Sequence, residues 1–169
     1  MAIQVIADCV TPGDTFVPMQ LDDYDGHQHV DMAVANGASR VVRMNVVQQA
    51  RAHRKKARMG IVAVLATDRD PGQRLARVLG MQYSVSYAAD SVSDPILSAA
   101  LGILNASVST DILVVPVVHS ALNRRVLQCL YPTHTVVLPG LQTQADKAAV
   151  LLPLRKQFPL VDRHVYWPY

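Results

Sequence analysis

The chain has 169 residues and a formal net charge of +3, and half of its residues are hydrophobic. This length suits one domain with its own core, and the apolar content excludes an intrinsically disordered chain. No apolar run reaches the roughly 18 residues of a membrane helix, and the N-terminus lacks the basic start of a secretory signal, so we expect a soluble cytoplasmic protein. All 13 acidic residues are aspartate, because the chain contains no glutamate.

Short apolar runs alternate with segments of helical length. Several runs are almost continuously apolar, as expected for strands covered on both faces of a parallel sheet. The alternation predicts an α/β fold, a three-layer sandwich with a mostly parallel, Rossmann-like sheet of about five or six strands, in one domain over residues 1–169. In chain order, the expected strands are 3–10, 39–47, 60–67, 81–87, 111–118 and 134–139, and the expected helices lie near 27–37, 48–58, 71–79, 95–106, 119–130 and 142–157.

Residues typical of helix ends support two of these helices. Asp70 and Asp94 each precede a proline, so each can cap a helix that begins with that proline. Gly80 stands where a left-handed residue would end the first of these helices. Pro116, inside the fifth strand, predicts that this strand is irregular or near an edge of the sheet.

Aromatic residues gather in a C-terminal tail, about residues 158–169, which contains Tyr166, Trp167 and Tyr169. Such a tail docks on its own domain or on a neighbouring subunit, so we expect a homo-oligomer. A non-enzymatic structural or assembly subunit, for example a viral one, is therefore an alternative to an enzyme.

Carboxylates follow the expected first and third strands. Ligands of open parallel sheets bind beyond the carboxyl ends of the strands, where Asp8, Asp68 and Asp70 would converge. Such a cluster suits Mg²⁺, which would polarise a phosphoryl group. The sequence thus predicts magnesium-dependent phosphodiester chemistry on nucleic acid or a nucleotide, with these three aspartates as catalytic residues and metal ligands. The same edge is expected to carry Cys9, Asn45, Asp90, His119 and Ser120.

The basic residues are concentrated in "RAHRKKAR", residues 51–58. Such a run is typical of a solvated helix face or of a surface that contacts phosphates. A nucleic-acid or nucleotide partner would be contacted by Arg51, Arg54, Lys55, Lys56 and Arg58, and by Gly72 at the start of a helix.

The segment "VAVLATDRDPGQRLARVL", residues 62–79, resembles the Asp-x-Asp segment of TOPRIM domains, which occur in topoisomerases, bacterial-type primases and related nucleases. The resemblance implies that Asp68 and Asp70 ligate magnesium and that Gly72 is a close-approach glycine. The segment is also similar to the Ser-Gly-Asp-x-Asp-Phe strand of NYN domains, relatives of PIN nucleases, where Asp8 and Asp31 would match further aspartates. Both resemblances imply metal-dependent work on nucleic acid.

A structural interpretation of the same aspartates remains open. Asp70 is explained by capping the helix of Pro71, and Arg69 can neutralise both neighbouring carboxylates as an ordinary surface pair. Asp68 has no equally simple structural role.

A second polar cluster lies in "DDYDGHQHVDM", residues 22–32. His27, His29 and Asp31 form an alternative metal site, similar to the His-x-His-x-Asp-His signature of metallo-β-lactamase-like hydrolases except that Met32 replaces the last histidine. Gly26-His27 also resembles the Gly-His turn of adenylyl-transferring nucleotidyltransferases. That resemblance implies a nucleotide phosphate at a helix N-terminus, and hence a nucleotide-binding transferase as the third candidate function.

Two other chemistries have less support. Cys9 could act as a nucleophile with His119 as its base. The Gly-x-Gly-x-x-Gly dinucleotide signature and the Gly-Lys-Ser/Thr phosphate-loop motif are both absent from the sequence, which disfavours NAD-type and P-loop chemistry.

Overall fold

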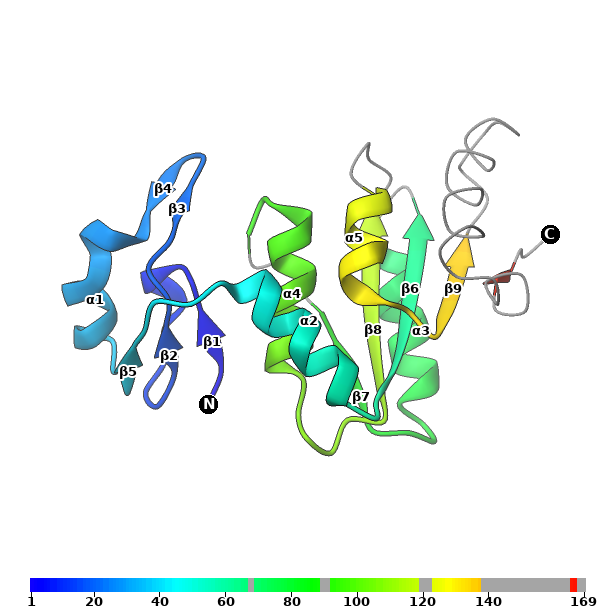
Figure 1. Ribbon diagram of the computed structural model, residues 1–169. Helices are drawn as coiled ribbons and strands as arrows, with labels where there is room; N and C mark the ends of the chain where they lie inside the picture. The colour runs from blue at the N-terminus through cyan, green and yellow to red at the C-terminus, as the bar shows by residue number, and fades with distance from the viewer. Residues whose placement is uncertain (67–68, 89–91, 119–122, 138–164, 167–169) are drawn as a thin grey trace. The chain divides into compact units, whose positions relative to one another are not determined.

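The computed structural model describes residues 1–66, 69–88, 92–118, 123–137 and 165–166 (Figure 1). Contacts within the chain form two compact units, Met1–Gln49 (unit 1) and Ala50–Tyr169 (unit 2). The single domain expected over residues 1–169 stays a prediction. Helix α2, Val46–Lys56, spans the boundary between them. In the described part of the chain, no helix combines the length and the apolar character needed to cross a bilayer.

Unit 1 is built on very short strands. A parallel sheet has the order β1-β2-β5, formed by Ile3–Gln4, Thr15–Phe16 and Arg40–Val41. Its core cluster contains Ala7, Val10, Phe16 and Ala33. The other elements are the antiparallel pair β3 (Gln20–Leu21) and β4 (Tyr24–Asp25), the 3-10 helices η1 (Ala7–Cys9) and η2 (Gly26–His29), and helix α1 (Val30–Ala35).

The expected strand over residues 3–10 is therefore wrong beyond Gln4. The backbone turns into η1, where the Cys9 N–H donates to the Ile6 carbonyl (3.1 Å) and the Ala7 N–H donates to the Tyr24 hydroxyl (2.8 Å). These partners replace the ladder that a longer strand would need, because buried backbone groups must be hydrogen-bonded somewhere. Asp8 and Cys9 consequently lie on a 3-10 helix in unit 1 and do not follow a strand of the larger sheet.

Unit 2 contains a five-stranded parallel sheet in the order β10-β9-β6-β8-β7. The central strands β6 and β8 pair over seven residues, and the side chains from Ile61 to Ala66 are all buried. A continuously apolar strand is expected where both faces of a sheet are covered. The strands are β6 (Gly60–Ala66), β7 (Val85–Tyr87), β8 (Ile112–Val118), β9 (His134–Val137) and β10 (Val165–Tyr166).

Helices cover both faces of this sheet. The crossover through α3 (Asp70–Leu79) and the crossover through α4 (Pro95–Asn105) run in opposite directions across the sheet, so right-handed connections place them on opposite faces. Helix α5 (Asn123–Leu130) packs beside α4, and Figure 1 shows both in front of the sheet with α3 behind it. The predicted α/β three-layer sandwich with a Rossmann-like parallel sheet is confirmed.

Pro116 does not place β8 at an edge, because β8 lies between β6 and β7. Ile112 and Val114 direct their backbone groups towards the β7 side, where Ser84 and Ala88 are their partners. By the alternation of backbone groups along a strand, Pro116 also faces the β7 side, but the pairing of β7 with β8 ends at Tyr87. The missing N–H of proline therefore points beyond the end of the neighbouring strand and removes no ladder bond.

The helix-end predictions have mixed outcomes. The Asp94 carboxylate accepts hydrogen bonds from the N–H groups of Ile96 (2.7 Å) and Leu97 (3.2 Å), so Asp94 is the predicted N-cap of α4. Asp70 is the first residue inside α3, where Arg69 is the N-cap. Gly80 has φ −62° and ψ −12°, so the predicted left-handed stop is wrong and α3 ends in right-handed geometry.

Candidate functional site

The carboxyl edge of the unit 2 sheet has the topology of a ligand site. Strands β6 and β8 are neighbours, yet the chain leaves β6 towards β7 on one side and leaves β8 towards β9 on the other. In open α/β sheets, ligands bind at such a switch point, outside the carboxyl ends of the two strands. The described residues at this edge are the end of β6 at Ala66 and the first turn of α3.

The first turn of α3 carries charge of both signs. The Asp70 carboxylate lies 3.8 Å from the Arg74 guanidinium, and the two side chains are 74% and 79% exposed. An ion pair this exposed contributes little to stability, on the order of 0.5 kcal/mol. Arg69 makes no capping hydrogen bond with its side chain. The charged side chains of Arg69, Asp70 and Arg74 are therefore exposed to solvent.

Gly72 is the buried residue of this turn. A Cβ atom at Gly72 would lie 3.4 Å from Cε2 of Tyr87 and 3.5 Å from Cβ of Pro116. Gly72 thus lies within van der Waals distance of β7 and β8, and a Cβ atom there would make ordinary contacts. The role of Gly72 as a close-approach glycine and its contact with phosphate both remain predictions.

The predicted magnesium ligands are spread over the chain. Asp8 is an exposed residue of η1 in unit 1, Asp70 begins α3 in unit 2, and Asp68 lies outside the described residues. Within the described ranges, no group of three or more His, Cys, Asp or Glu side chains could hold a metal ion. Asp90, His119 and Ser120 also lie outside the described residues. The magnesium site of Asp8, Asp68 and Asp70 stays a prediction.

Other residues expected at this edge have local roles. Asn45 lies in unit 1, where its side-chain oxygen accepts a hydrogen bond from the Gln48 N–H (2.9 Å) at the start of α2. Cys9 is an exposed free cysteine.

The basic run divides into one structural residue and an exposed set. The Arg54 guanidinium is half-buried and donates to the carbonyls of Leu130, Tyr131 and Met59, each at 3.2 Å. Burial lowers the pKa of Arg54, although an arginine remains charged. Arg54 therefore ties α2 to the segment before β9, which explains it without a polyanion. The side chains of Arg51, Lys55, Lys56 and Arg58 are exposed.

The histidine-rich loop of unit 1 is organised by Asp25. Its carboxylate accepts hydrogen bonds from the His27 backbone N–H (3.0 Å) and from Gln28 Nε2 (3.1 Å), and lies 2.9 Å from His27 Nδ1. The hydrogen bond with the His27 side chain is the main cause that lowers the pKa of Asp25. The His29 ring stacks on Tyr24, with centroids 4.9 Å apart. The described structure does not bring His27, His29 and Asp31 together as metal ligands.

Gly26 has a steric reason to be glycine, since a Cβ atom there would lie 2.9 Å from the Met19 backbone nitrogen. The Gly26 N–H donates to the Met19 carbonyl (2.8 Å), and the His27 N–H is bound by Asp25. Both backbone donors of the Gly-His turn are thus occupied within the protein. A phosphate at this turn would have to displace these bonds.

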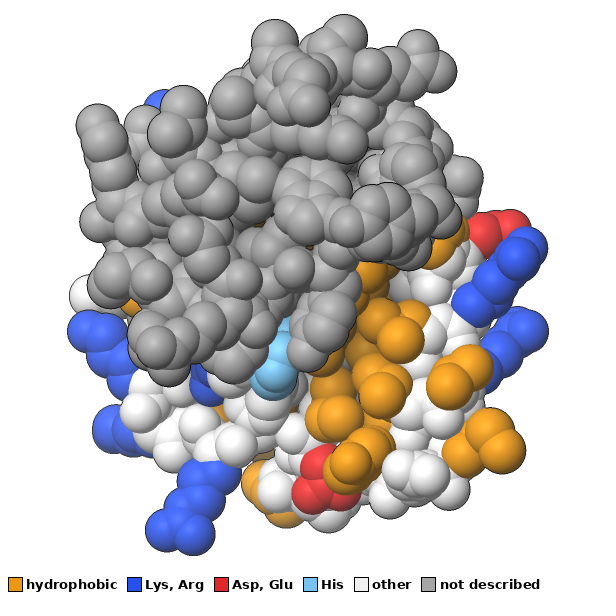
Figure 2. Space-filling model, turned by 90° about the vertical axis from the view of Figure 1, so that its right-hand side faces the viewer, with side chains coloured by type: hydrophobic (Ala, Val, Ile, Leu, Met, Phe, Trp, Pro, Cys, Tyr) orange, Lys and Arg blue, Asp and Glu red, His pale blue; other side chains and the backbone are white. Residues whose placement is uncertain are grey.

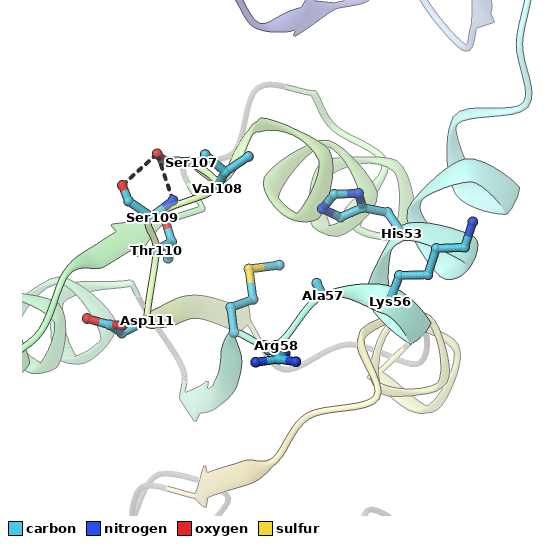
Figure 3. Close-up of a pocket in the computed structure, with 10 residues that line it drawn as sticks. His53, Lys56, Ala57, Arg58, Ser107, Val108, Ser109, Thr110 and Asp111 are labelled. Carbon is cyan, nitrogen blue, oxygen red and sulfur yellow. Dashed lines mark hydrogen bonds between the residues drawn. The ribbon is translucent and has the colours of Figure 1, made fainter.

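A pocket that the sequence analysis missed lies at the amino edge of the unit 2 sheet, opposite the switch point (Figure 3). Its volume is about 400 Å³. Its walls come from the C-terminal end of α2 and the turn between α4 and β8. In the sequence, the signal for this pocket is two polar segments, 53–58 and 107–111, that each precede an apolar strand. Because β6 and β8 are neighbours in the sheet, the segments that lead into these strands lie side by side.

Hydrophobic side chains are exposed on unit 2. Val78, Met81 and Tyr83, in the last turn of α3 and the turn after it, are 63%, 83% and 49% exposed. Figure 2 shows hydrophobic side chains gathered on one face of the molecule, with Lys and Arg at the margins. The described part of the aromatic tail, β10, pairs with β9 of the same chain through Tyr166 and Val136. Homo-oligomer formation stays a prediction.

These features define an α/β sandwich with an open parallel sheet. Solved structures of similar fold include the MurF ligase from Thermotoga maritima in complex with ADP, with a TM-score of 0.63 and 19% identity over 98% of this chain and 49% of that chain. A MurF structure from Acinetobacter baumannii gives a TM-score of 0.64 at 14% identity over 98% and 41% of the two chains. The chain thus spans about half the length of these relatives or less. No protein-family model and no curated protein matches the sequence.

Proposed function

We propose that unit 2 binds a nucleotide, with its phosphate groups at the switch point between β6 and β8. The observation that carries the proposal is the topology, because β6 and β8 are adjacent strands whose connections leave in opposite directions, and α3 begins directly beyond β6. The similar fold of a MurF ligase in complex with ADP supports a nucleotide as the ligand.

The first turn of α3 supplies suitable groups for phosphate. The Gln73 N–H donates to the Arg69 carbonyl (3.2 Å), and Gly72 precedes Gln73 in the first turn of α3, at the positive end of the helix dipole. Arg69, the N-cap residue, and Arg74, just beyond the first turn of α3, have exposed side chains. Together they would hold an anionic group that the isolated peptide dipoles would bind only weakly.

Asp70 gives this site its metal chemistry. Mg²⁺ in nucleotide sites is held by one or two carboxylates together with phosphate oxygens and water, so a single exposed carboxylate at this turn is sufficient. Bound there, the ion would neutralise phosphate charge beside Asp70. We propose nucleotide binding and no catalytic step, because the sequence has no lysine between Met59 and Leu79 and no Gly-Lys-Ser/Thr motif.

The proposal moves the nucleotide from the Gly26-His27 turn to unit 2. Both N–H groups of that turn are already hydrogen-bonded within unit 1, whereas Gly72 lies at the N-terminal end of α3. Phosphodiester chemistry on nucleic acid and the assembly role remain sequence-based predictions, and neither gains support from the similar solved structures.

Calorimetry on the full chain tests the proposal. We expect saturable binding of ADP that is stronger with MgCl₂, and at least tenfold weaker binding in Arg69→Gln. Asp70→Asn should remove the effect of Mg²⁺ while leaving metal-free binding in place. Arg77→Gln is the matched control, since Arg77 is exposed on the last turn of the same helix, about 10 Å along its axis from Asp70. Absence of heat at millimolar ADP, or equal weakening by Arg77→Gln, would refute the proposal.

A further inference from the structure

The pocket at the amino edge of the sheet has basic residues on one wall. His53 and Lys56 belong to α2, and Arg58 follows it, just before β6 begins at Gly60. Neither Lys56 nor Arg58 has a salt bridge or side-chain hydrogen bond within the described chain. Their positive charges are therefore not neutralised by a carboxylate of the described residues.

Hydroxyl groups stand on the other wall. Ser107 Oγ and Ser109 Oγ lie 2.9 Å apart, and Ser107 Oγ also accepts from the Ser109 N–H (3.3 Å). One hydroxyl proton of the pair bonds the two oxygens to each other, so the other proton is available to a ligand. Figure 3 shows this serine pair across the cavity from His53, Lys56 and Arg58.

The remaining polar residues of the wall are already engaged. Thr110 Oγ1 lies 2.7 Å from Ser86 Oγ, and the Asp111 carboxylate accepts from the Ser84 N–H (2.9 Å). Asp111 is the one carboxylate in the lining, against two permanent cations. The pocket therefore favours an anion, because its unused groups are cations and a hydroxyl donor.

We propose that this pocket binds a small phosphorylated molecule, with the phosphate group between Arg58 and the Ser107–Ser109 pair. A guanidinium and a hydroxyl are matched donors for phosphate oxygens. A volume of about 400 Å³ is within the range of small-molecule sites and leaves room for more than a phosphate ion. Met59, which is 7% exposed, gives the pocket an apolar wall for the body of the ligand.

This pocket is separate from the proposed nucleotide site. It lies before the first residues of β6 and β8, while the switch point lies after their last residues. Seven residues of parallel strand span about 20 Å. One small ligand cannot reach both ends, so the two sites can be occupied together.

Titration calorimetry on the full chain, with glycerol 3-phosphate, inorganic phosphate and glycerol as probes, tests the proposal. We expect saturable binding of glycerol 3-phosphate and none of glycerol. Arg58→Gln should weaken this binding at least tenfold, and Ser107→Ala about threefold. Arg51→Gln is the matched control, because Arg51 is exposed on α2 and does not line the pocket.

The probes also identify the form of the ligand. Inorganic phosphate binding as tightly as the ester would support the pocket with free phosphate as its ligand, whereas preference for the ester would support a phosphorylated small molecule. Binding must persist at saturating ADP, which separates this pocket from the nucleotide site. No saturable heat up to 10 mM of either phosphate probe, on the order of the weakest useful affinities, overturns the proposal, as does equal weakening by Arg51→Gln.

Discussion

In unit 1 the strands have two residues each, and much of the order comes from side chains that bind backbone. The buried carboxylate of Asp14 accepts hydrogen bonds from the Ala2 N–H (2.7 Å), the Thr11 N–H (3.2 Å) and the Thr11 hydroxyl (2.8 Å). In unit 2, β6 and β8 pair over seven residues and bury apolar side chains. Unit 1 thus combines a small hydrophobic cluster with a side chain that binds backbone, while unit 2 is built on a longer strand ladder with apolar side chains on both faces.

The largest expected effect is in the core of unit 2. Leu127, on α5, is fully buried, so Leu127→Ala should lower the free energy of unfolding by about 2–5 kcal/mol through lost burial and a cavity. Hydrogen exchange should show the loss in the amides of β6 and β8, with unit 1 unchanged. Val108→Ala, at a fully exposed position, is the control and should have an effect of about 0.5 kcal/mol or less. Equal loss of protection against hydrogen exchange in both units would contradict the idea that the two units are stabilised separately.

A smaller effect is expected from Asp14→Ala in unit 1. The substitution leaves the N–H groups of Ala2 and Thr11 without their acceptor, which costs about 1–3 kcal/mol. Hydrogen exchange should show faster exchange in β1, β2 and β5 and none of this change in unit 2. Asp8→Ala, at an exposed aspartate of the same unit, is the control.

The same carboxylate makes unit 1 sensitive to acid. Hydrogen bonds from the Ala2 N–H and from Thr11 hold the pKa of Asp14 below its usual value. A carboxyl group with a lowered folded-state pKa stabilises the fold above its unfolded pKa, about 3.9, and this stabilisation is lost as the pH falls through the folded value. Protection of unit 1 should therefore fall below pH about 4. In Asp14→Ala this acid-dependent loss should be smaller, and an unchanged pH profile would contradict the role of Asp14.

The smallest expected losses of stability are at the two aspartates that precede prolines, Asp70 and Asp94. Asp94→Ala removes two capping hydrogen bonds of α4 and should cost about 1 kcal/mol. Asp70→Ala should cost less, because Asp70 stands inside α3 and its ion pair with Arg74 is exposed. Thermal unfolding of both variants checks this order. If Asp70→Ala loses more thermal stability than Asp94→Ala, Asp70 has a structural role in α3.

Unit 2 was largely predictable from the sequence, because its hydrophobic pattern and its structure coincide. The strand expected at 60–67 is observed at Gly60–Ala66, and the helix expected at 95–106 is Pro95–Asn105. Both are long, apolar and bounded by proline or aspartate, so local signals and tertiary burial agree. Gly80 is the C-cap of α3, but the left-handed geometry predicted for it is wrong, because glycine is equally able to adopt right-handed geometry.

Unit 1 was poorly predictable because its partners are distant in the sequence. The strand expected at 39–47 is observed only at Arg40–Val41. Its pairing with β2 depends on Phe16, and the turn before β2 depends on Asp14, neither of which marks residues 39–47 as a short strand. The phosphate pocket was missed for a related reason, since Arg58 and Ser107 meet only once the order of β6 and β8 is known.

The position of Tyr87 beside the first turn of α3 gives the protein an intrinsic optical reporter. The ring of Tyr87 borders the missing side chain at the first turn of α3. If a nucleotide binds as proposed and displaces that turn, the asymmetric surroundings of the ring will change. Near-ultraviolet circular dichroism of tyrosine records such a change without a label. Since the chain has six tyrosines, the difference between the wild type and Tyr87→Phe isolates this signal. The event at the edge of the sheet can thus be followed in the unmodified chain.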